Sequence, residues 1–440
     1  MRLLPVLLLA VAGGAQAAPL DLSVHEKTLP NGLQVIAVER FTAPTVSVQL
    51  WVRTGSRDER PGITGIAHLF EHMMFKGSKS MGPEQHAQEV MKIGGQLNAY
   101  TTNDATVYYE DVAAPNFERI LELEAERFQN LALSDGMLQS EREVVKEERR
   151  MRTDNSPTGT LIEAFYGAAY TTSPYRWPVV GWMKDLDAIK LEDCQQFFDA
   201  HYNPQNITVI VVGALPAAKV FAGVEKHFGA WAAKPRPARS YAPEAPPTAR
   251  REKTVTFATN TPLLLGGWQV PAAKHEDIVA LKVLGGILSD GRSSRMHRDL
   301  VYDKEIAQYA AGDVLTHVDN GQFYLWSAAR PGVDIDAVEK AMLDVVRGVV
   351  EGGVNEEELA RAKAQAESSS VNKLKKAHGI ASLLGWNLMY HGDWRPALHE
   401  LDKLRAVTAA DVQRVAKTYL DPQRMTVVKL LPETAKEAAK

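Results

Sequence analysis

Two histidines and a glutamate stand close together in the segment IAHLFEHMMFKG, as His68, Glu71 and His72. On a helix, residues four positions apart lie one turn apart on the same face, so the two imidazoles could bind one ion. Zinc prefers nitrogen ligands, and a catalytic zinc takes three protein ligands while a fourth position stays open for water. Glu71 could lean over that position without binding the ion and take a proton from the water. The pattern predicts metal-assisted hydrolysis, provided that a third ligand exists.

The third ligand is expected from an acidic segment further along the chain, SEREVVKEERRMR, whose composition favours a helix. Glu141 and Glu148 are seven positions apart in this segment and therefore share one helix face. Val144 and Val145 indicate that part of the helix is buried. Most acids in such a segment are simple surface charge, and the residues alone do not decide which carboxylate, if any, reaches the histidines.

The elements that must position these residues predict an α+β fold for the first half of the chain. Strands are expected from β-branched, alternating patterns at LQVIAVE, VSVQLWVRT, QLNAYTT and ATVYYEDVA. Helices are expected over residues 63–75, 84–93, 116–131 and 135–152. Hairpin strands followed by runs of helices favour a mostly antiparallel sheet with helices packed on one face.

The second half of the chain repeats the first. LDAIKLEDCQQFFDAHYNPQNITVI, from Leu186, aligns with LRAVTAADVQRVAKTYLDPQRMTVV, from Leu404. Two amphipathic helices could match by chance, but here the proline turn and the strand match in register too, which favours a duplicated α/β unit. Between the halves, residues 232–250 are rich in proline and are expected to be extended and surface-bound. We therefore expect an N-terminal domain over residues 18–231 and a C-terminal domain over residues 251–440.

The N-terminus predicts export. One arginine, an apolar run from Leu3 to Ala12 and the small residues AQA are typical of a secretory signal peptide over residues 1–17. The apolar run is too short to span a bilayer, and no cysteine follows it that could carry a lipid anchor. We expect a periplasmic chain without a membrane span. Its net charge of −4 gives no reason to expect nucleic acid as a partner.

The combination of HLFEH with the later EREVVKEE resembles the pitrilysin/insulysin family of zinc metallopeptidases, which includes the mitochondrial processing peptidase and carries an inverted H-x-x-E-H motif. The resemblance continues through LPNGLQVIAVE, GSRDE, GGQLNAYTTNDATVYY, MRTDNSP and SDGRSSRMHRDL, over almost the whole chain after the signal peptide. It implies that His68, His72 and Glu148 hold one zinc ion per chain. It also implies that Glu71 is the general base and that Glu141 is a second acid supporting the site.

The same resemblance implies a substrate and an architecture. Asn98 and Ala99 fall on the family's substrate-facing edge strand, where a peptide would add as an antiparallel strand, held by the Asn98 side chain and the Ala99 backbone. The family fold is a processing-peptidase-like pair of repeated α/β units, here joined by the proline-rich linker. Two such pairs close as a clamshell in the family. The implied activity is that of an endopeptidase acting on peptides or unfolded polypeptides.

Two positions in the second half depart from the family pattern. The helix that should match the metal-binding helix, near residues 286–290, reads GILSD and offers no ligands, so one metal site is expected. The family's second half usually carries an arginine and a tyrosine that reach the substrate. The aligned residues here are Val301 and Gln308. Tyr302 and Tyr309 each lie one position away from the expected place. On a strand, a shift of one residue turns the side chain to the opposite face of the sheet, so we expect the pair to be missing.

The missing pair predicts a partner. We expect the chain to be the zinc-bearing subunit of a heterodimer in which a homologous exported subunit supplies the arginine and tyrosine. A homodimer, or a non-catalytic scaffold subunit of the same fold, is the alternative. A metal-handling protein is a third reading, but it would need more clustered ligands than one histidine pair and a glutamate.

Overall fold

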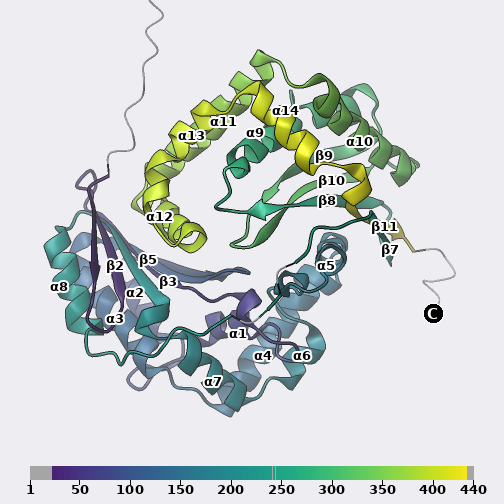
Figure 1. Ribbon diagram of the computed structural model, residues 1–440. Coiled ribbons are helices and arrows are strands. Elements are labelled where there is room, and N and C mark those ends of the chain that lie inside the picture. The colour runs from purple at the N-terminus through teal and green to yellow at the C-terminus, as the bar shows by residue number, and fades with distance from the viewer. Residues whose placement is uncertain (1–21, 240, 243, 434–440) are drawn as a thin grey trace, which may run out of the picture.

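The computed structural model describes residues 22–239, 241–242 and 244–433. The predicted signal peptide over residues 1–17 lies outside the described residues. The described chain forms two sheets, one in each half, which face each other across interposed helices (Figure 1). No helix within the described residues is long and apolar enough to cross a membrane.

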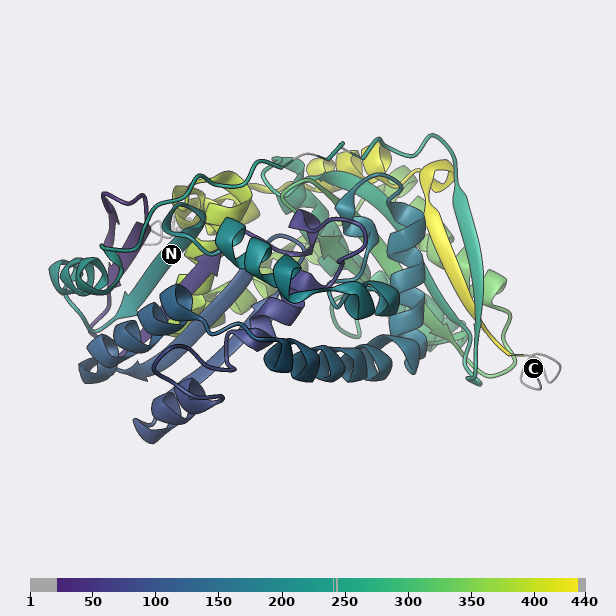
Figure 2. The same cartoon turned by 90° about the horizontal axis from the view of Figure 1, so that it is seen from below.

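The first sheet has the strand order β1-β2-β6-β3-β5-β4 and the second the order β7-β11-β8-β10-β9. The strands of the first sheet are β1 (Val24–Thr28), β2 (Gln34–Glu39), β3 (Thr45–Val52), β4 (Gln96–Thr101), β5 (Thr106–Ala113) and β6 (Ile207–Gly213). Those of the second are β7 (Arg251–Phe257), β8 (Leu263–Ala272), β9 (Ala307–Leu315), β10 (Asn320–Ala329) and β11 (Thr426–Pro432). Figure 2 shows β7 and β11 at one end of the molecule and the β1 region near the other.

The two sheets share the same strand order and the same pattern of parallel and antiparallel pairs. Without β1, their strand orders coincide position by position, and each has one parallel pair, β2 with β6 and β7 with β11. All other neighbours are antiparallel. The sequence repeat maps onto this duplication, because both copies form helices, a proline turn and then the strand β6 or β11. The predicted α+β class with two repeated units is confirmed.

Helices of the first half cover one face of the first sheet and enclose its main core. They are α1 (Ile66–Met73), α2 (Gln85–Lys92), α3 (Phe117–Asn130), α4 (Asp135–Arg149), α6 (Met183–Ala188), α7 (Leu191–His201) and α8 (Ala217–Phe228), whereas α5 (Pro157–Ala169) packs elsewhere. The helix predicted over residues 135–152 is α4 followed by a π-helical turn, Arg150–Asp154. The other helices and strands predicted for this half are present within a few residues, whereas the short edge strand β1 was not predicted.

The second half contributes α9 (Asp277–Ser289), α10 (Ile335–Gly352), α11 (Glu356–Leu374), α12 (Ala377–His391), α13 (Glu400–Ala406) and α14 (Ala409–Tyr419). Most of these helices cover one face of the second sheet, but α12 packs on the open face of the first sheet, against β3 and β6 (Figure 1). In return, α5 of the first half packs against β7, β8 and β11 of the second sheet. Each sheet is therefore buried on both faces, the second face by one helix from the opposite half.

The proline-rich stretch 232–250 contains no helix or strand in the part that the structure describes, as predicted. It does not lie wholly on the surface, however, because Glu244 is only 7% exposed. Its carboxylate accepts hydrogen bonds from the backbone N–H groups of Thr171, Thr172 and Ser173 at 3.0, 2.8 and 2.9 Å. The linker is thus bound to the first half at this point.

Candidate metal centre

The short helix α1 that carries the H-x-x-E-H motif is fixed at its first turn. Gly65 precedes it with φ 91°, and a Cβ there would lie 2.5 Å from the Val180 carbonyl oxygen, so glycine is required on both grounds. The buried carboxylate of Glu59 accepts hydrogen bonds from the N–H groups of Gly65 and Ala67, each at 2.9 Å. An acceptor at a helix N-terminus satisfies backbone N–H groups that the first turn leaves unpaired. The segment GSRDE thus orients α1.

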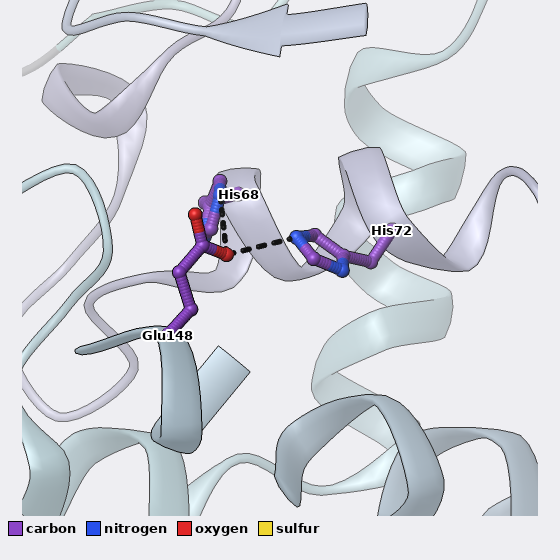
Figure 3. Close-up of side chains that lie close together, drawn as sticks. All are labelled: His68, His72 and Glu148. Atoms are coloured by element: carbon purple, nitrogen blue, oxygen red, sulfur yellow. Dashed lines mark ion pairs between the residues drawn. The ribbon is translucent and has the colours of Figure 1, made fainter. Parts of the chain in front are cut away.

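The structure brings the three predicted metal ligands together (Figure 3). Oε2 of Glu148, from α4, lies 3.6 Å from Nε2 of His68 and 3.3 Å from Nε2 of His72. One ligand atom from each residue lies within 4.8 Å of the other two. We call these three residues the ligand cluster.

The protonation states of His68 and Glu148 suit a divalent cation. Burial first, and then the neighbouring His72, lowers the pKa of His68 to about 4, so its imidazole is neutral near pH 7. The hydrogen bond with His72 first, and the positive charge of Arg152 with it, lower the pKa of Glu148 to about 2, although partial burial opposes this. Neutral imidazole and ionised carboxylate are the forms that bind metal, and two nitrogens with one oxygen are a common catalytic zinc set. The residues present therefore fit a zinc ion.

Glu141 lies beside the ligand cluster. Its side chain is buried, and Oε2 lies 3.8 Å from Nδ1 of His72, the ring nitrogen that does not face Glu148. Its other oxygen pairs with Nζ of Lys76 at 3.3 Å. A carboxylate on the far nitrogen of a ligating histidine fixes the tautomer and the orientation of the ring. Glu141 is the carboxylate nearest to this nitrogen of His72, but its Oε2 makes no hydrogen bond among the described residues.

Glu71 stands on α1 between the two histidines but is not part of the ligand cluster. Its Oε2 accepts a hydrogen bond from Oγ1 of Thr101, at the end of β4, at 2.6 Å. Burial raises the pKa of Glu71, and the bond from Thr101 opposes that rise. Thr101 could not be predicted, because a strand residue 30 positions away from Glu71 carries no local signal of this contact.

The predicted substrate strand is at the edge of its sheet. β4 is the last strand in the order, and within the described residues it pairs with β5 alone. It also lies against α1, so this edge runs beside the ligand cluster. Asn98 is exposed, whereas Ala99 is buried and donates its backbone N–H to Oδ1 of Asn98 at 2.9 Å. Tyr100 stacks on Trp386 of α12, with the ring centroids 6.4 Å apart.

A second group of possible ligands lies in the core of the first half, formed by His86, Glu110 and Glu124. The guanidinium of Arg127 already occupies the place of a cation there. Its Nη2 lies 3.1 Å from Oε1 of Glu110 and 2.6 Å from Oε1 of Glu124. Because a metal ion would have to displace this buried arginine, we assign no metal to the group.

The part of the second half that the structure describes holds no comparable group. The segment 286–290 belongs largely to α9, whose residues are mostly apolar and buried. Gln308, at one position of the missing pair, donates from Nε2 to the Ala329 carbonyl at 3.0 Å. Tyr309 packs on Trp326, with the ring centroids 5.1 Å apart.

Comparison with known proteins shows the family to which this chain belongs. Residues 34–181 match the family described as insulinase (peptidase family M16), and residues 188–366 match the peptidase M16 inactive domain. The zinc protease PqqE of Helicobacter pylori is 32% identical over 434 residues, which cover 97% of each chain. The chain belongs to the M16 insulinase family of peptidases.

Further M16 relatives support the same family assignment. A crystal structure of a protease from Helicobacter pylori superposes with a TM-score of 0.90 at 31% identity, covering 93% of this chain and 100% of that one. A probable mitochondrial-processing peptidase subunit beta of Arabidopsis thaliana is 26% identical over 403 residues, covering 89% of this chain and 75% of the relative. The predicted resemblance to pitrilysin and insulysin is confirmed. Because several of these M16 relatives are named zinc proteases, the comparison supports a metallopeptidase that uses zinc.

Proposed function

We propose that this M16 chain is a zinc-dependent endopeptidase that hydrolyses peptides or unfolded polypeptides. The observation that carries the proposal is the convergence of His68, His72 and Glu148, with Glu71 beside them and hydrogen-bonded to Thr101. A zinc ion bound by the ligand cluster, one per chain, would polarise the scissile carbonyl and lower the pKa of the attacking water. A scaffold role would leave this arrangement without a use.

Each side chain has a distinct part in the proposed reaction. Glu71 takes a proton from the attacking water and gives it to the leaving amine, and its raised pKa suits both transfers. Glu141, whose Oε2 lies 3.8 Å from Nδ1 of His72, would support the ring of His72 by moving within hydrogen-bond distance of this far nitrogen. The peptide lies antiparallel along the free edge of β4, where Asn98 and the Ala99 backbone hold its main chain.

The chain is proposed to act as the zinc-bearing subunit of a two-chain clamshell. Val301 and Gln308 stand where the family carries its arginine and tyrosine, so a homologous partner would supply that pair. One relative is itself named a subunit beta, which supports a divided assembly. Both chains are proposed to be exported to the periplasm, in line with the N-terminal signal pattern. A homodimer or a non-catalytic scaffold subunit is the second candidate.

Replacing the general base tests the activity. Glu71→Gln keeps the ligand cluster intact, so the variant should retain zinc while its peptide-cleavage rate falls by roughly 100-fold or more. Zinc content is measured by plasma emission and cleavage with a quenched fluorescent peptide, both with and without a chelator. Equal cleavage by the variant and the wild type, or cleavage unaffected by metal removal, would contradict the proposal.

Isolation of the chain from its own cells tests the partnership. A tagged chain should co-purify with an M16 subunit lacking H-x-x-E-H, and adding that subunit should raise the cleavage rate of the purified chain. A chain that reaches its full rate alone, whatever is added, would rule out the heterodimer.

A further inference from the structure

The tips of two hairpins from opposite halves of the chain meet beside the candidate site. One tip is the β4–β5 turn, residues 102–105, which directly follows Thr101. The other is the β9–β10 loop, residues 316–319. β4 and β9 are the matching edge strands of the two sheets, so the duplicated fold brings equivalent hairpins together.

Asp104 is the residue through which the second hairpin holds the first. It is 3% exposed, and Oδ2 accepts a hydrogen bond from the backbone N–H of Val318 at 3.1 Å and lies 3.4 Å from Nδ1 of His317. Its other oxygen accepts from the Tyr175 hydroxyl at 2.7 Å and pairs with Nη1 of Arg57 at 2.9 Å. Burial alone would raise the pKa of Asp104, but His317 and Arg57 together lower it, so the carboxylate is ionised.

The second hairpin is itself held on several sides. The His317 ring stacks on Tyr175, with the centroids 4.1 Å apart, and the backbone N–H of Asp319 donates to the Tyr175 hydroxyl at 3.3 Å. The linker also contacts this loop, because the Tyr241 hydroxyl donates a hydrogen bond to Oδ2 of Asp319 at 2.6 Å. These contacts leave the β9–β10 loop little freedom to move relative to Asp104.

The β4–β5 turn directly follows Thr101, the residue that contacts the proposed general base Glu71. Thr102 closes the turn, with its N–H donating to the Ala105 carbonyl at 2.8 Å and its hydroxyl accepting from the N–H of Asp104 at 3.1 Å. Thr101, the preceding residue, donates to Glu71 at 2.6 Å. A displacement of the turn would therefore move the Thr101 hydroxyl and leave Glu71 without its fixed partner.

We propose that the second half of the chain positions the general base of the first half, with Asp104 and Thr101 as the positioning residues. Loop 316–319 fixes Asp104, Asp104 fixes the β4–β5 turn, and the turn sets the Thr101 hydroxyl on Glu71. This inference rests on the proposed peptidase function. It gives the second half, which offers no metal ligands in its described residues, a part in the reaction beyond covering the site.

The chain offers a matched control for Asp104. Asp277, on α9, is 5% exposed and accepts from Nη2 of Arg414 at 2.6 Å and from the Tyr419 hydroxyl at 2.7 Å. It therefore has the same partners, an arginine and a tyrosine, but lies in the second half and outside both hairpins. Asp104→Asn and Asp277→Asn remove the same charge from a buried carboxylate, although Arg414 is half exposed and Arg57 is buried.

The test compares these two variants, together with Thr101→Val and Thr101→Ser, in their zinc-loaded forms. Because a small misplacement of a catalytic group is costly, Asp104→Asn and Thr101→Val should lower kcat by about 10- to 100-fold, with a smaller change in KM and full zinc content. Thr101→Ser keeps the hydroxyl and should restore most of kcat, whereas Asp277→Asn should keep the wild-type kcat. Equal kcat in the Asp104→Asn and Asp277→Asn variants, or an undiminished kcat for Thr101→Val, would overturn the inference.

Hydrogen exchange gives a readout that does not depend on activity. Peptides spanning residues 96–106 should exchange faster in Asp104→Asn than in the wild type, and at the wild-type rate in Asp277→Asn. Unchanged exchange at the β4–β5 turn would overturn the proposed hold even if the wild-type chain cleaved no peptide. Absence of any metal-dependent cleavage would instead count against the proposed function, so the two failures are distinguishable.

Discussion

At the scale of single residues, Glu148 divides its two oxygens between different neighbours. Oε2 faces both imidazoles of the ligand cluster, whereas Oε1 pairs with Nη1 of Arg152 at 2.5 Å. Arg152 is 74% exposed, so this ion pair is open to solvent and contributes little to stability. The next residue back, Glu147, is 62% exposed and pairs with Arg150. Two consecutive glutamates of the same helix therefore differ in whether they can reach a metal.

This difference predicts unequal effects of the same substitution. Glu148→Gln removes a charged ligand and should weaken zinc binding by more than about 100-fold, since loss of even an outer partner of a ligand weakens binding by roughly 10- to 100-fold. Glu147→Gln should bind zinc like the wild type. Competition with a chromophoric chelator at pH 7 measures both affinities. A Glu148→Gln variant that kept the wild-type affinity would remove this residue from the ligand cluster.

The site could be predicted from the sequence in part. The spacing of His68 and His72 predicted a pair of candidate ligands, and the family resemblance selected Glu148 among the acids of its helix; the structure places these three side chains close together. The contacts of Glu59 and Thr101 were not predicted, because they depend on how a loop and a strand pack against α1. Sequence periodicity describes which residues share a face of one element, and it carries little information about contacts between elements.

At the scale of elements, α12 shows how closely the two halves fit. A Cβ on Gly385 would lie 2.1 Å from the ring of Trp51, which is fully buried in β3. Glycine at this point lets the helix backbone approach the indole. The same helix also places Ile380, Leu384 and Leu388 on the sheet, so its docking completes a separate core between the halves.

A pair of glycine substitutions tests this packing. Gly385→Ala forces a methyl group into the Trp51 ring and should lower the free energy of unfolding by about 1–3 kcal/mol. Gly167→Ala, at an exposed helical position of α5 with no atom within 4 Å of the added Cβ, should instead raise it by up to about 1 kcal/mol. Urea denaturation followed by tryptophan fluorescence measures both. Stabilisation by Gly385→Ala would mean that α12 does not dock as described.

The helices and strands were mostly predictable from the sequence. The packing of α12 and α5 on the sheet of the opposite half was not. Alternation and turn residues located β2 to β5 and α1 to α4 within a few residues. The strand β6 reads ITVIVVG and is buried at every position, which is typical of a strand covered on both faces. Nothing in that run could indicate that α12, far along the chain, supplies the cover on the second face.

At the scale of the whole molecule, the linker binds the first half through an ionised carboxylate. Burial opposes ionisation of Glu244, but the N–H groups of Ser173, Thr172 and Thr171 outweigh it and lower its pKa to about 2. A carboxyl group whose pKa is lower in the folded chain stabilises that chain above its unfolded pKa. Its contribution disappears as the pH falls through the folded value.

The pH dependence of stability tests the contribution of the Glu244 carboxylate. Glu244→Gln should lower the free energy of unfolding at pH 7, and the difference from the wild type should persist down to about pH 4.5 and shrink as the pH approaches about 2. Glu357→Gln, at a side chain that is 90% exposed in the first turn of α11, should change the free energy of unfolding by no more than about 1 kcal/mol at any pH. Urea titrations at a series of pH values measure the differences. A difference that grew on acidification would contradict the assigned role of the Glu244 carboxylate.

The account of the whole chain depends on one metal held between α1 and α4. X-ray diffraction from zinc-loaded crystals, recorded on both sides of the zinc absorption edge, tests this most directly. We predict one strong anomalous peak per chain, at about 2.0–2.2 Å from Nε2 of His68, Nε2 of His72 and a carboxylate oxygen of Glu148. A zinc-loaded crystal with no peak at that point, or with its peak at His86, Glu110 and Glu124 instead, would contradict the account.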